Sequence, residues 1–176
     1  MKYETLTFDG EVLRLLDQRK LPNAIEYFEA KTYKDVEYAI ADMVVRGAPA
    51  IGAAAAFGVY LAAAEYVGLS REKFLAKLSE ASQVLESARP TAVNLSWAIG
   101  RMANKVAKME GDPVGSIVDS LLEEAKAIAR EDVETNKAIA HHGNDVVSPG
   151  STILTHCNTG ALATVGWGTA LGIILE

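Results

Sequence analysis

Cysteine is almost absent from this chain of 176 residues, in which Cys157 is the only one. A single cysteine cannot form an internal disulfide, so we expect a reducing compartment and a cytoplasmic location. Basic residues are also in the minority, since 17 Lys and Arg against 23 Asp and Glu give a formal net charge of -6. A general nucleic-acid binder would carry a basic face, so this charge argues against nucleic acid as a partner.

The sequence has neither the charged opening with an apolar run that marks a signal peptide nor a long uninterrupted hydrophobic stretch. The Ala-rich run 48–64 is short and contains glycines, which predicts a buried core helix rather than a membrane span. Apolar residues make up 49% of the chain and charged residues 23%, the ordinary composition of a soluble globular protein. We therefore expect no membrane partner.

Charged side chains are missing from the end of the chain, where Glu176 is the only one after Asp145. A helix over 166–175 would be apolar on nearly every side and would need cover on both faces. Parallel strands also need neighbours and crossovers. We therefore predict that residues 149–176 begin a Rossmann-like domain that is incomplete here. Truncation or cleavage is the favoured explanation, and the alternative is that another chain supplies the remaining strands.

Residues 1–148 predict a small antiparallel β unit followed by a helical bundle. Together with the first strand and helix of the Rossmann-like domain, this makes the expected fold class α/β overall. Candidate strands 3–8 and 12–16 flank Asp9-Gly10, a strong hairpin signal, and 26–30 is a third strand. Five helices are expected, over 32–46, 50–66, 70–88, 91–109 and 114–147. Their starts are assigned to Thr32 with Asp35, Pro49, Ser70, Thr91, and Asp112-Pro113.

Residues 151–161 combine an apolar run, a small polar turn around Cys157 and the start of an apolar segment. This pattern predicts a buried parallel strand that leads into a helix, with the cysteine at the turn. Ligands of open α/β sheets bind outside the carboxyl ends of the strands. A helix N-terminus there favours anions and thiolates. Cys157 is thus a candidate catalytic residue, although a buried structural cysteine remains the alternative.

Two arginines precede candidate helix starts, Arg46 within 45–52 and Arg89 within 88–97. Gly47 would let the backbone approach a ligand closely. The N–H groups of the helix starts can hold an anion, and guanidinium groups bind phosphate in a bidentate manner. This combination suits a sugar phosphate. The alternative is that both arginines form salt bridges or cap helix C-termini.

The histidines do not suggest a metal site. His141 and His142 are adjacent and would project from different faces of one helix, and His156 beside Cys157 lacks the spacing of zinc ligands. We therefore expect no metal.

Two further groups of residues allow more than one interpretation. Asn94, Ser96 and Trp97 could line a pocket, although an aromatic residue at helical spacing is more often part of the core. An acidic cluster on the last long helix predicts a solvated face, and no pair of carboxylates suggests acid/base catalysis. That cluster consists of Glu123, Glu124, Glu131, Asp132 and Glu134.

Three segments, Arg-Gly-Ala-Pro-Ala-Ile-Gly (46–52), Arg-Pro-Thr-Ala-Val-Asn-Leu-Ser-Trp-Ala (89–98) and Thr-His-Cys-Asn-Thr-Gly-Ala-Leu-Ala (155–163), are jointly specific. With them, essentially the whole chain resembles the methylthioribose-1-phosphate isomerase family, within the superfamily of translation initiation factor 2B regulatory subunits. The resemblance implies an aldose–ketose isomerase of methionine salvage, that is, an intramolecular oxidoreductase. It also implies no metal or organic cofactor, a small sugar phosphate as ligand, and a homodimer when full length.

The resemblance further assigns roles to residues. It makes Cys157 the active-site cysteine and Arg46, Gly47, Ala48 and Arg89 substrate-binding residues. The family's catalytic aspartate belongs to the Rossmann-like half and has no counterpart here, so we expect these 176 residues alone to lose most turnover.

Two alternatives stay open. One is a ribose-1,5-bisphosphate isomerase, which would need more cationic groups. The other is a non-catalytic regulatory subunit resembling initiation factor 2B components, against which Cys157 and both arginines argue.

Overall fold

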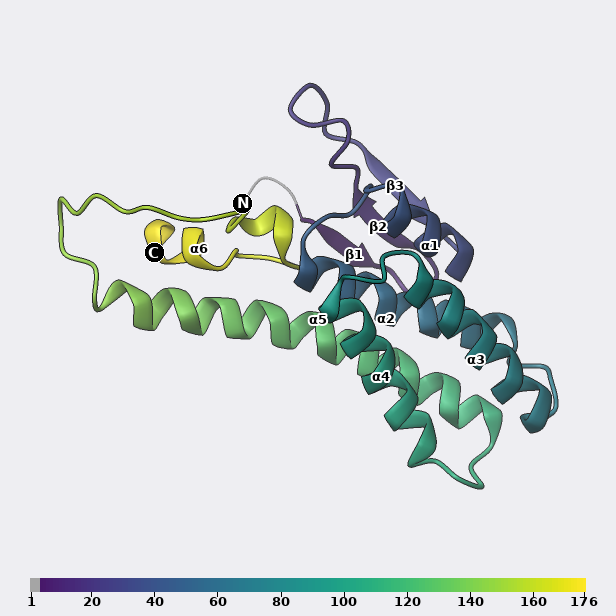
Figure 1. Cartoon of the computed structure of the whole chain (residues 1–176). Coiled ribbons are helices and arrows are strands. Elements are labelled where there is room, and N and C mark those ends of the chain that lie inside the picture. Colours follow the sequence, from purple (N-terminus) through teal and green to yellow (C-terminus); the bar gives the residue numbers. More distant parts are fainter. Residues whose placement is uncertain (1–3) are drawn as a thin grey trace.

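The computed structural model describes residues 4–176 and places a small sheet on one side of a helical bundle (Figure 1). The sheet has the strand order β1 (Leu6–Phe8), β2 (Leu13–Leu16) and β3 (Tyr27–Ala30), all antiparallel. The helices are α1 (Tyr33–Ala41), α2 (Ala48–Glu65), α3 (Arg71–Ser87), α4 (Val93–Ala107), α5 (Val114–Asn144) and α6 (Ala170–Leu175). The chain is therefore mostly helical with one small sheet, and the prediction of a β unit followed by five helices is confirmed.

The hairpin forms where Asp9-Gly10 predicted it. The Asp9 carboxylate accepts hydrogen bonds from the backbone N–H groups of Glu11 and Val12, while Gly10 takes a positive φ of 113°. Leu13 and Leu15 alternate with an exposed residue and turn into the core. All three predicted strands are confirmed in shortened form. Tyr3, at the predicted start of the first strand, lies outside the described residues.

Helix α2 is the centre of the molecule, because α1, α3, α4 and α5 all pack against it. Its small side chains allow close approach: a Cβ added at Gly58 would lie 3.0 Å from Leu85 and from Val36. Among residues 4–176 it is the one helix long and apolar enough to cross a membrane, yet 72% of it is buried inside the protein. The prediction of a buried core helix over this run is confirmed.

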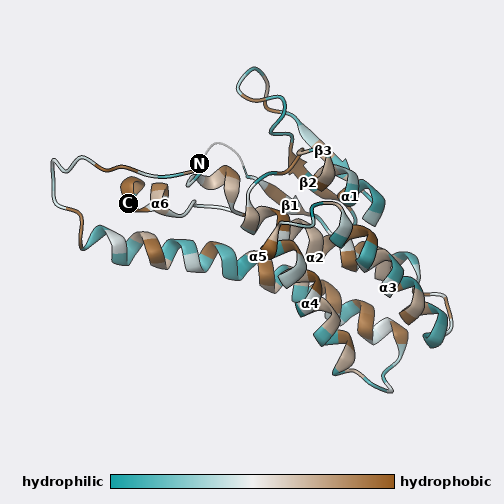
Figure 2. Ribbon diagram, in the orientation of Figure 1, coloured by the Kyte–Doolittle hydropathy of each residue, from teal (hydrophilic) through white to brown (hydrophobic). Residues whose placement is uncertain are grey.

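Helix α5 is long and two-faced. Figure 2 shows bands of hydrophilic and hydrophobic residues alternating along it, as expected for a helix with one buried stripe. Its first half packs on α2 and α4, and its second half on the C-terminal segment. The helix therefore joins the bundle to the residues that follow it.

The predicted helix starts are confirmed to within a few residues, but the expected capping interactions form at only some of them. Thr32 and Asp35 form the expected capping box. Ser70 stands at its N-cap position without making a cap hydrogen bond. Helix α4 begins after Ala92 rather than at Thr91, and α5 after Pro113, so that Asp112 does not act as the cap.

The end of the first helix was predicted too late. Helix α1 ends at Ala41 rather than near Arg46. Met43 adopts a positive φ of 60°, which interrupts the helix. Val44 is nevertheless buried, so its apolar spacing reported burial rather than helical structure.

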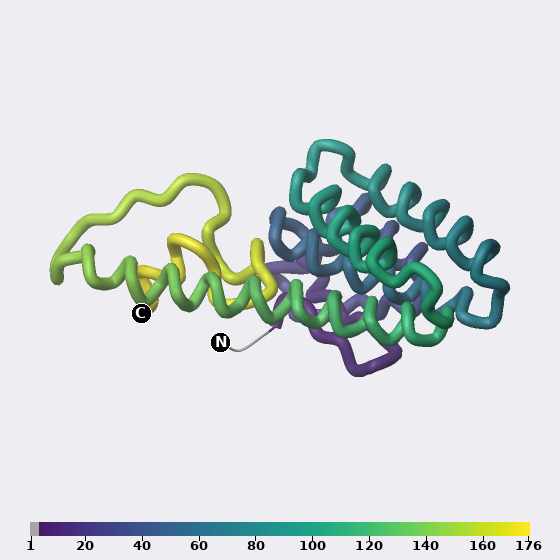
Figure 3. Tube along the Cα trace, turned by 90° about the horizontal axis from the view of Figure 1, so that it is seen from below, coloured from purple at the N-terminus to yellow at the C-terminus, as the bar shows by residue number. Residues whose placement is uncertain are grey.

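The predicted strand over 151–155 was wrong. These residues have no strand assignment, and Leu154 is 96% exposed. A strand needs a partner for its backbone groups, and no described segment supplies one. The chain instead turns back along α5 toward the bundle (Figure 3) and forms a short 3-10 turn, Ala161–Ala163, before α6. The start of a Rossmann-like domain at 149 stays a prediction.

Candidate functional site

The starts of α2 and α4 lie against each other. A Cβ added at Gly52, in the second turn of α2, would lie 2.9 Å from the backbone oxygen of Asn94. Pro49 and Asn94 share a pocket of about 250 Å³ with Trp97 and residues of α5. The structure thereby brings together two of the segments that the sequence singled out.

Both helix starts present backbone N–H groups. Gly47 is the N-cap of α2 with φ 95°, and Ala92 is the N-cap of α4, and neither makes a side-chain cap hydrogen bond. The first N–H groups of a helix have no partner within the helix and carry partial positive charge. Such ends bind phosphate and other anions.

The two arginines stand beside these starts. Arg46 is exposed and Arg89 half-buried. Within residues 4–176 neither guanidinium takes part in an ion pair or a side-chain hydrogen bond. The alternative, in which both arginines form salt bridges or helix C-caps, therefore does not hold for the described part of the chain. Both guanidinium groups are available to bind an anion.

Gly47 has a second role that spacing alone did not suggest. Its position would leave no room for a side chain, because an added Cβ would overlap the backbone of Ala163. Neighbouring Ala48 is exposed at the first position of α2. The start of α2 is thus the place where the 159–169 segment, which follows the cysteine, meets the bundle.

Cys157 lies on an exposed segment with a positive φ of 65°. It does not stand at a helix start, since the next regular element is the short turn Ala161–Ala163. The predicted strand-to-helix placement was therefore wrong, and so was the alternative of a buried structural cysteine. Within the described residues no hydrogen bond joins Cys157 to Arg46 or Arg89, and its catalytic role stays a prediction.

Asp132 is the residue that the sequence interpretation missed. The acidic run predicts a solvated position, but Asp132 is half-buried and lines the same pocket as Pro49 and Asn94. One carboxylate oxygen accepts the backbone N–H of Val165 at 2.7 Å, and the other accepts from Asn136 at 3.1 Å. Burial raises the pKa of Asp132 despite these hydrogen bonds. The position of Asn136, four residues after Asp132, could have indicated this burial. Residues i and i+4 share a helix face, and Asn136 is buried.

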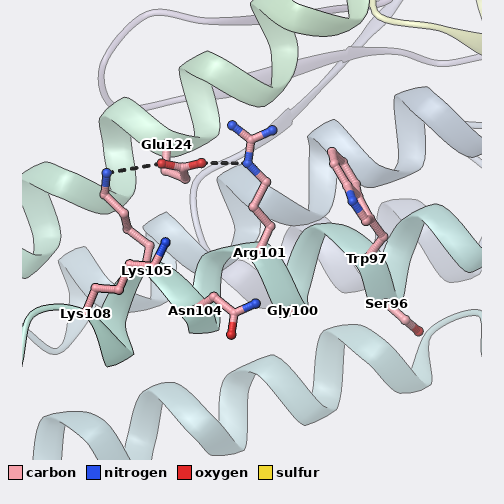
Figure 4. Close-up of a pocket in the computed structure, with 8 residues that line it drawn as sticks. All are labelled: Ser96, Trp97, Gly100, Arg101, Asn104, Lys105, Lys108 and Glu124. Atoms are coloured by element: carbon pink, nitrogen blue, oxygen red, sulfur yellow. Dashed lines mark hydrogen bonds and ion pairs between the residues drawn. The ribbon is translucent and has the colours of Figure 1, made fainter.

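Another part of the acidic cluster is also not a free solvated face. Figure 4 shows Glu124, on α5, between Arg101 and Lys105 of α4, at 2.6 and 3.2 Å. Burial acts against its ionisation, but the hydrogen bonds from Arg101 and Lys105 hold the pKa of Glu124 below its usual value. The side chains of Glu123 and Glu134 are exposed, as predicted.

Trp97 belongs to pockets rather than to the core. Its side chain is 51% exposed, and the Arg101 guanidinium lies 5.7 Å from its ring centroid. It lines the small pocket beside Pro49 and, with Ser96, a second cavity of about 500 Å³ along α4 (Figure 4). The pocket-lining alternative for Asn94, Ser96 and Trp97 is therefore the one that the structure supports.

Comparisons with known proteins place this arrangement in context. The methylthioribose-1-phosphate isomerase of Caldanaerobacter subterraneus subsp. tengcongensis is 57% identical over 173 residues, which is 98% of this chain and 50% of that protein. Its counterpart in Thermosipho africanus is 52% identical over 179 residues, covering 99% of this chain and 50% of that protein. The chain spans about half the length of the curated relatives it matches.

Two solved structures share the fold. The crystal structure of 5-methylthioribose 1-phosphate isomerase from Pyrococcus horikoshii OT3 has a TM-score of 0.93 at 40% identity, covering 99% of this chain and 49% of that one. The translation initiation factor eIF-2B subunit delta from A. fulgidus has a TM-score of 0.87 at 40% identity, covering 99% and 50%. The model of the Initiation factor 2 subunit family matches residues 44–176. Because that match spans both helix starts and most of the sequence, the chain belongs to the initiation factor 2 subunit family.

Proposed function

We propose that the full-length protein converts 5-methylthioribose 1-phosphate to 5-methylthioribulose 1-phosphate. The observation that carries this proposal is the pair of adjoining helix starts without side-chain caps, each preceded by an arginine whose guanidinium makes no ion pair or hydrogen bond among residues 4–176. Such a place suits a phosphate monoester, because N–H groups and guanidinium forks complement its oxygens. The names of the relatives at 52% and 57% identity supply the substrate.

Each site residue has a proposed role. Arg46 and Arg89 bind the phosphate or sugar oxygens, while Gly47 and Ala48 present the backbone at the start of α2. Cys157 acts at the reacting carbons, either by stabilising the transition state or by assisting proton movement. The protein is proposed to work as a cytoplasmic homodimer without a metal or organic cofactor, with residues 1–148 as one domain and 149 onward as a Rossmann-like one.

The chemistry demands an acid. The phosphate of the substrate is attached to the anomeric oxygen, so the sugar ring cannot open as a free aldose does. A proton must reach the ring oxygen as the ring breaks, and hydrogen then moves from C2 to C1 by an enediol or a hydride shift. General acid–base catalysis contributes roughly 10²–10⁴-fold. A version restricted to residues 1–176 should therefore bind phosphate weakly and lose most turnover.

The experiment that tests the role of the thiol is Cys157→Ser in the full-length protein. Serine has a similar shape, but its hydroxyl is a much weaker acid than the thiol. We therefore expect kcat to fall by about 10²–10⁴-fold while substrate still binds. An unchanged kcat would rule out a chemical role for Cys157. Arg46→Met and Arg89→Met should instead weaken substrate binding, and Arg130→Met on the exposed side of α5 serves as the matched control.

The alternatives predict different assay results. A ribose-1,5-bisphosphate isomerase would prefer the bisphosphate in competition between the two sugars. A regulatory subunit would show no turnover at all. The A. fulgidus protein shares the fold at 40% identity, so the fold does not separate these functions, whereas the relatives at higher identity are all isomerases by name.

A further inference from the structure

We infer that Thr5, Gln18 and Asp132 are positioning residues that fix the 161–165 segment against the start of α2. This inference rests on the proposed function, because it concerns the placement of Cys157 relative to Arg46. Three side chains from three distant parts of the chain form hydrogen bonds with the backbone of that one short segment. We call these three residues the clamp.

The clamp contacts are short and directional. The Thr5 hydroxyl donates to the Ala161 carbonyl at 2.7 Å. The Gln18 amide donates to the Leu162 carbonyl at 2.7 Å, and Asp132 accepts from the Val165 N–H at the same distance. The Thr5 bond is buried and the other two are partly buried, so that water competes poorly for these groups.

Gln18 links the clamp directly to the proposed substrate site. Its amide nitrogen also reaches the backbone carbonyl of Arg46, at 3.4 Å. The same side chain therefore holds the backbone before α2 and the backbone of Leu162. Gly47, next to Arg46, completes the contact, because only the absence of a Cβ lets Ala163 approach it.

The two ends of the 159–169 segment contact each other close to Cys157. The Thr159 carbonyl accepts the N–H of Thr169 at 2.9 Å, and Gly168 lies so close to Gly160 that an added Cβ would be 2.8 Å from its carbonyl carbon. Thr164 is fully buried and accepts the N–H of Gly168. Residues 159–169 thus form a compact loop, and Cys157 stands two residues before it.

The physical consequence is that the loop that follows Cys157 is held against the start of α2, where the proposed phosphate site lies. A displacement of about 1 Å at a reacting group can cost about 10²-fold in rate. Loss of the Thr5 and Asp132 contacts should therefore lower kcat, while the arginines and helix starts that bind phosphate keep their places in the bundle and leave KM nearly unchanged. Loss of Gln18, which also holds the Arg46 backbone, should raise KM as well.

The test uses the full-length protein and matched variants. Thr5→Val removes the hydroxyl at similar shape, whereas Thr5→Ser keeps it and should retain the original kcat. Gln18→Met removes the amide donor. Asp132→Ala removes both acceptors, and Asp132→Asn keeps one. Glu134→Ala, at an exposed position of the same helix, is the control.

We expect kcat to fall by about 100-fold when Thr5→Val and Asp132→Ala are combined, with little change in KM. Amide hydrogen exchange should become faster over 161–168 but not in α2. Unchanged exchange, unchanged kcat, or a higher KM at constant kcat would each overturn the inference. If Asp132→Ala fails to fold, Asp132→Asn and the Thr5 pair decide it. Absence of turnover in the unaltered protein would refute the proposed function instead, and exchange would still report whether the clamp holds the segment.

Discussion

Residues 4–147 and residues 148–176 differ in how their apolar side chains are covered. In the first part the large apolar residues of α2, α3, α4 and α5 meet in one core, with Phe74, Leu95 and Leu121 fully buried. In the second part many large apolar residues stay exposed. These are Ile153, Leu154, Leu171, Ile174 and Leu175.

The second part is held instead by directed contacts. Backbone groups of 161–165 bond to Thr5, Gln18 and Asp132, and α6 reaches α5 where Gly143 leaves room for Ile173. Burial of apolar area contributes roughly 25 cal/mol per Å² without any demand on direction, whereas a hydrogen bond sets a position. The bundle therefore supplies stability, and the directed contacts set the position of the loop next to Cys157.

We expect the largest difference in the free energy of unfolding when one leucine of each part is replaced by alanine. Leu121→Ala should lower the free energy of unfolding by about 2–5 kcal/mol, since Leu121 is 0% exposed and its removal leaves a cavity. Leu154→Ala, at an exposed position, should change it by less than about 0.5 kcal/mol. Urea unfolding followed by the helical circular dichroism signal measures both. Equal losses would abolish the distinction.

The second prediction concerns the close packing of the α2 and α4 backbones within residues 4–147. Gly52→Ala should destabilise by about 1–3 kcal/mol, because the new methyl group meets the backbone of Asn94. Gly100→Ala on α4 is the matched control, since nothing lies within 4 Å of its added Cβ. There the helix propensity of alanine should stabilise by about 0.5–1 kcal/mol. The comparison fails if both substitutions shift the melting temperature in the same direction.

The smallest effect concerns charge between α4 and α5. The hydrogen bond from Arg101 lowers the pKa of Glu131 below its ordinary value of 4.5. A lowered pKa in the folded state stabilises above the ordinary value, and this contribution is lost as the pH falls through the lowered one. For such partly exposed pairs we expect about 0.2–1 kcal/mol. Unfolding measured between pH 6 and pH 3 should show this loss, and Arg101→Met should flatten it.

Asp132 should respond in the opposite direction. Burial raises the pKa of its carboxyl above the ordinary 3.8. The ionised form is therefore penalised in the folded state, and the penalty is relieved as the pH falls through the raised pKa. A variant Glu134→Gln, at an exposed position of the same helix, should leave the pH profile as it is, whereas Asp132→Asn should remove this opposing contribution.

Much of the first part was predictable because local signals and burial agreed there. Asp9-Gly10 formed its turn, Thr32 with Asp35 formed a capping box, and the Ala-rich run became the central helix. Errors arose where one signal had two meanings. Val44 kept helical spacing but is buried beyond the end of α1, since apolar spacing reports burial and not backbone conformation.

The site was predictable only in part. Arg46 with Gly47 and Arg89 precede helix starts, as their order in the chain indicated. Pro49 and Asn94, from the same two segments, line one pocket. The burial of Asp132 was not predicted, because a carboxylate within an acidic run is expected to be solvated unless the segment that covers it is known. The strand over 151–155 failed for a related reason, since an extended apolar run becomes a strand only beside a partner.

Local sequence patterns were enough to predict the order of the helices, the hairpin, the two helix starts preceded by arginine, and the family. These follow from hydrophobic spacing, turn chemistry and short motifs, all of which act over a few residues. Three features became known from the folded chain alone: Gly47 contacts Ala163, Gln18 binds the carbonyls of both Arg46 and Leu162, and Asp132 is half-buried. Those contacts link residues far apart in the chain, and no local pattern records which distant backbone group a side chain will meet.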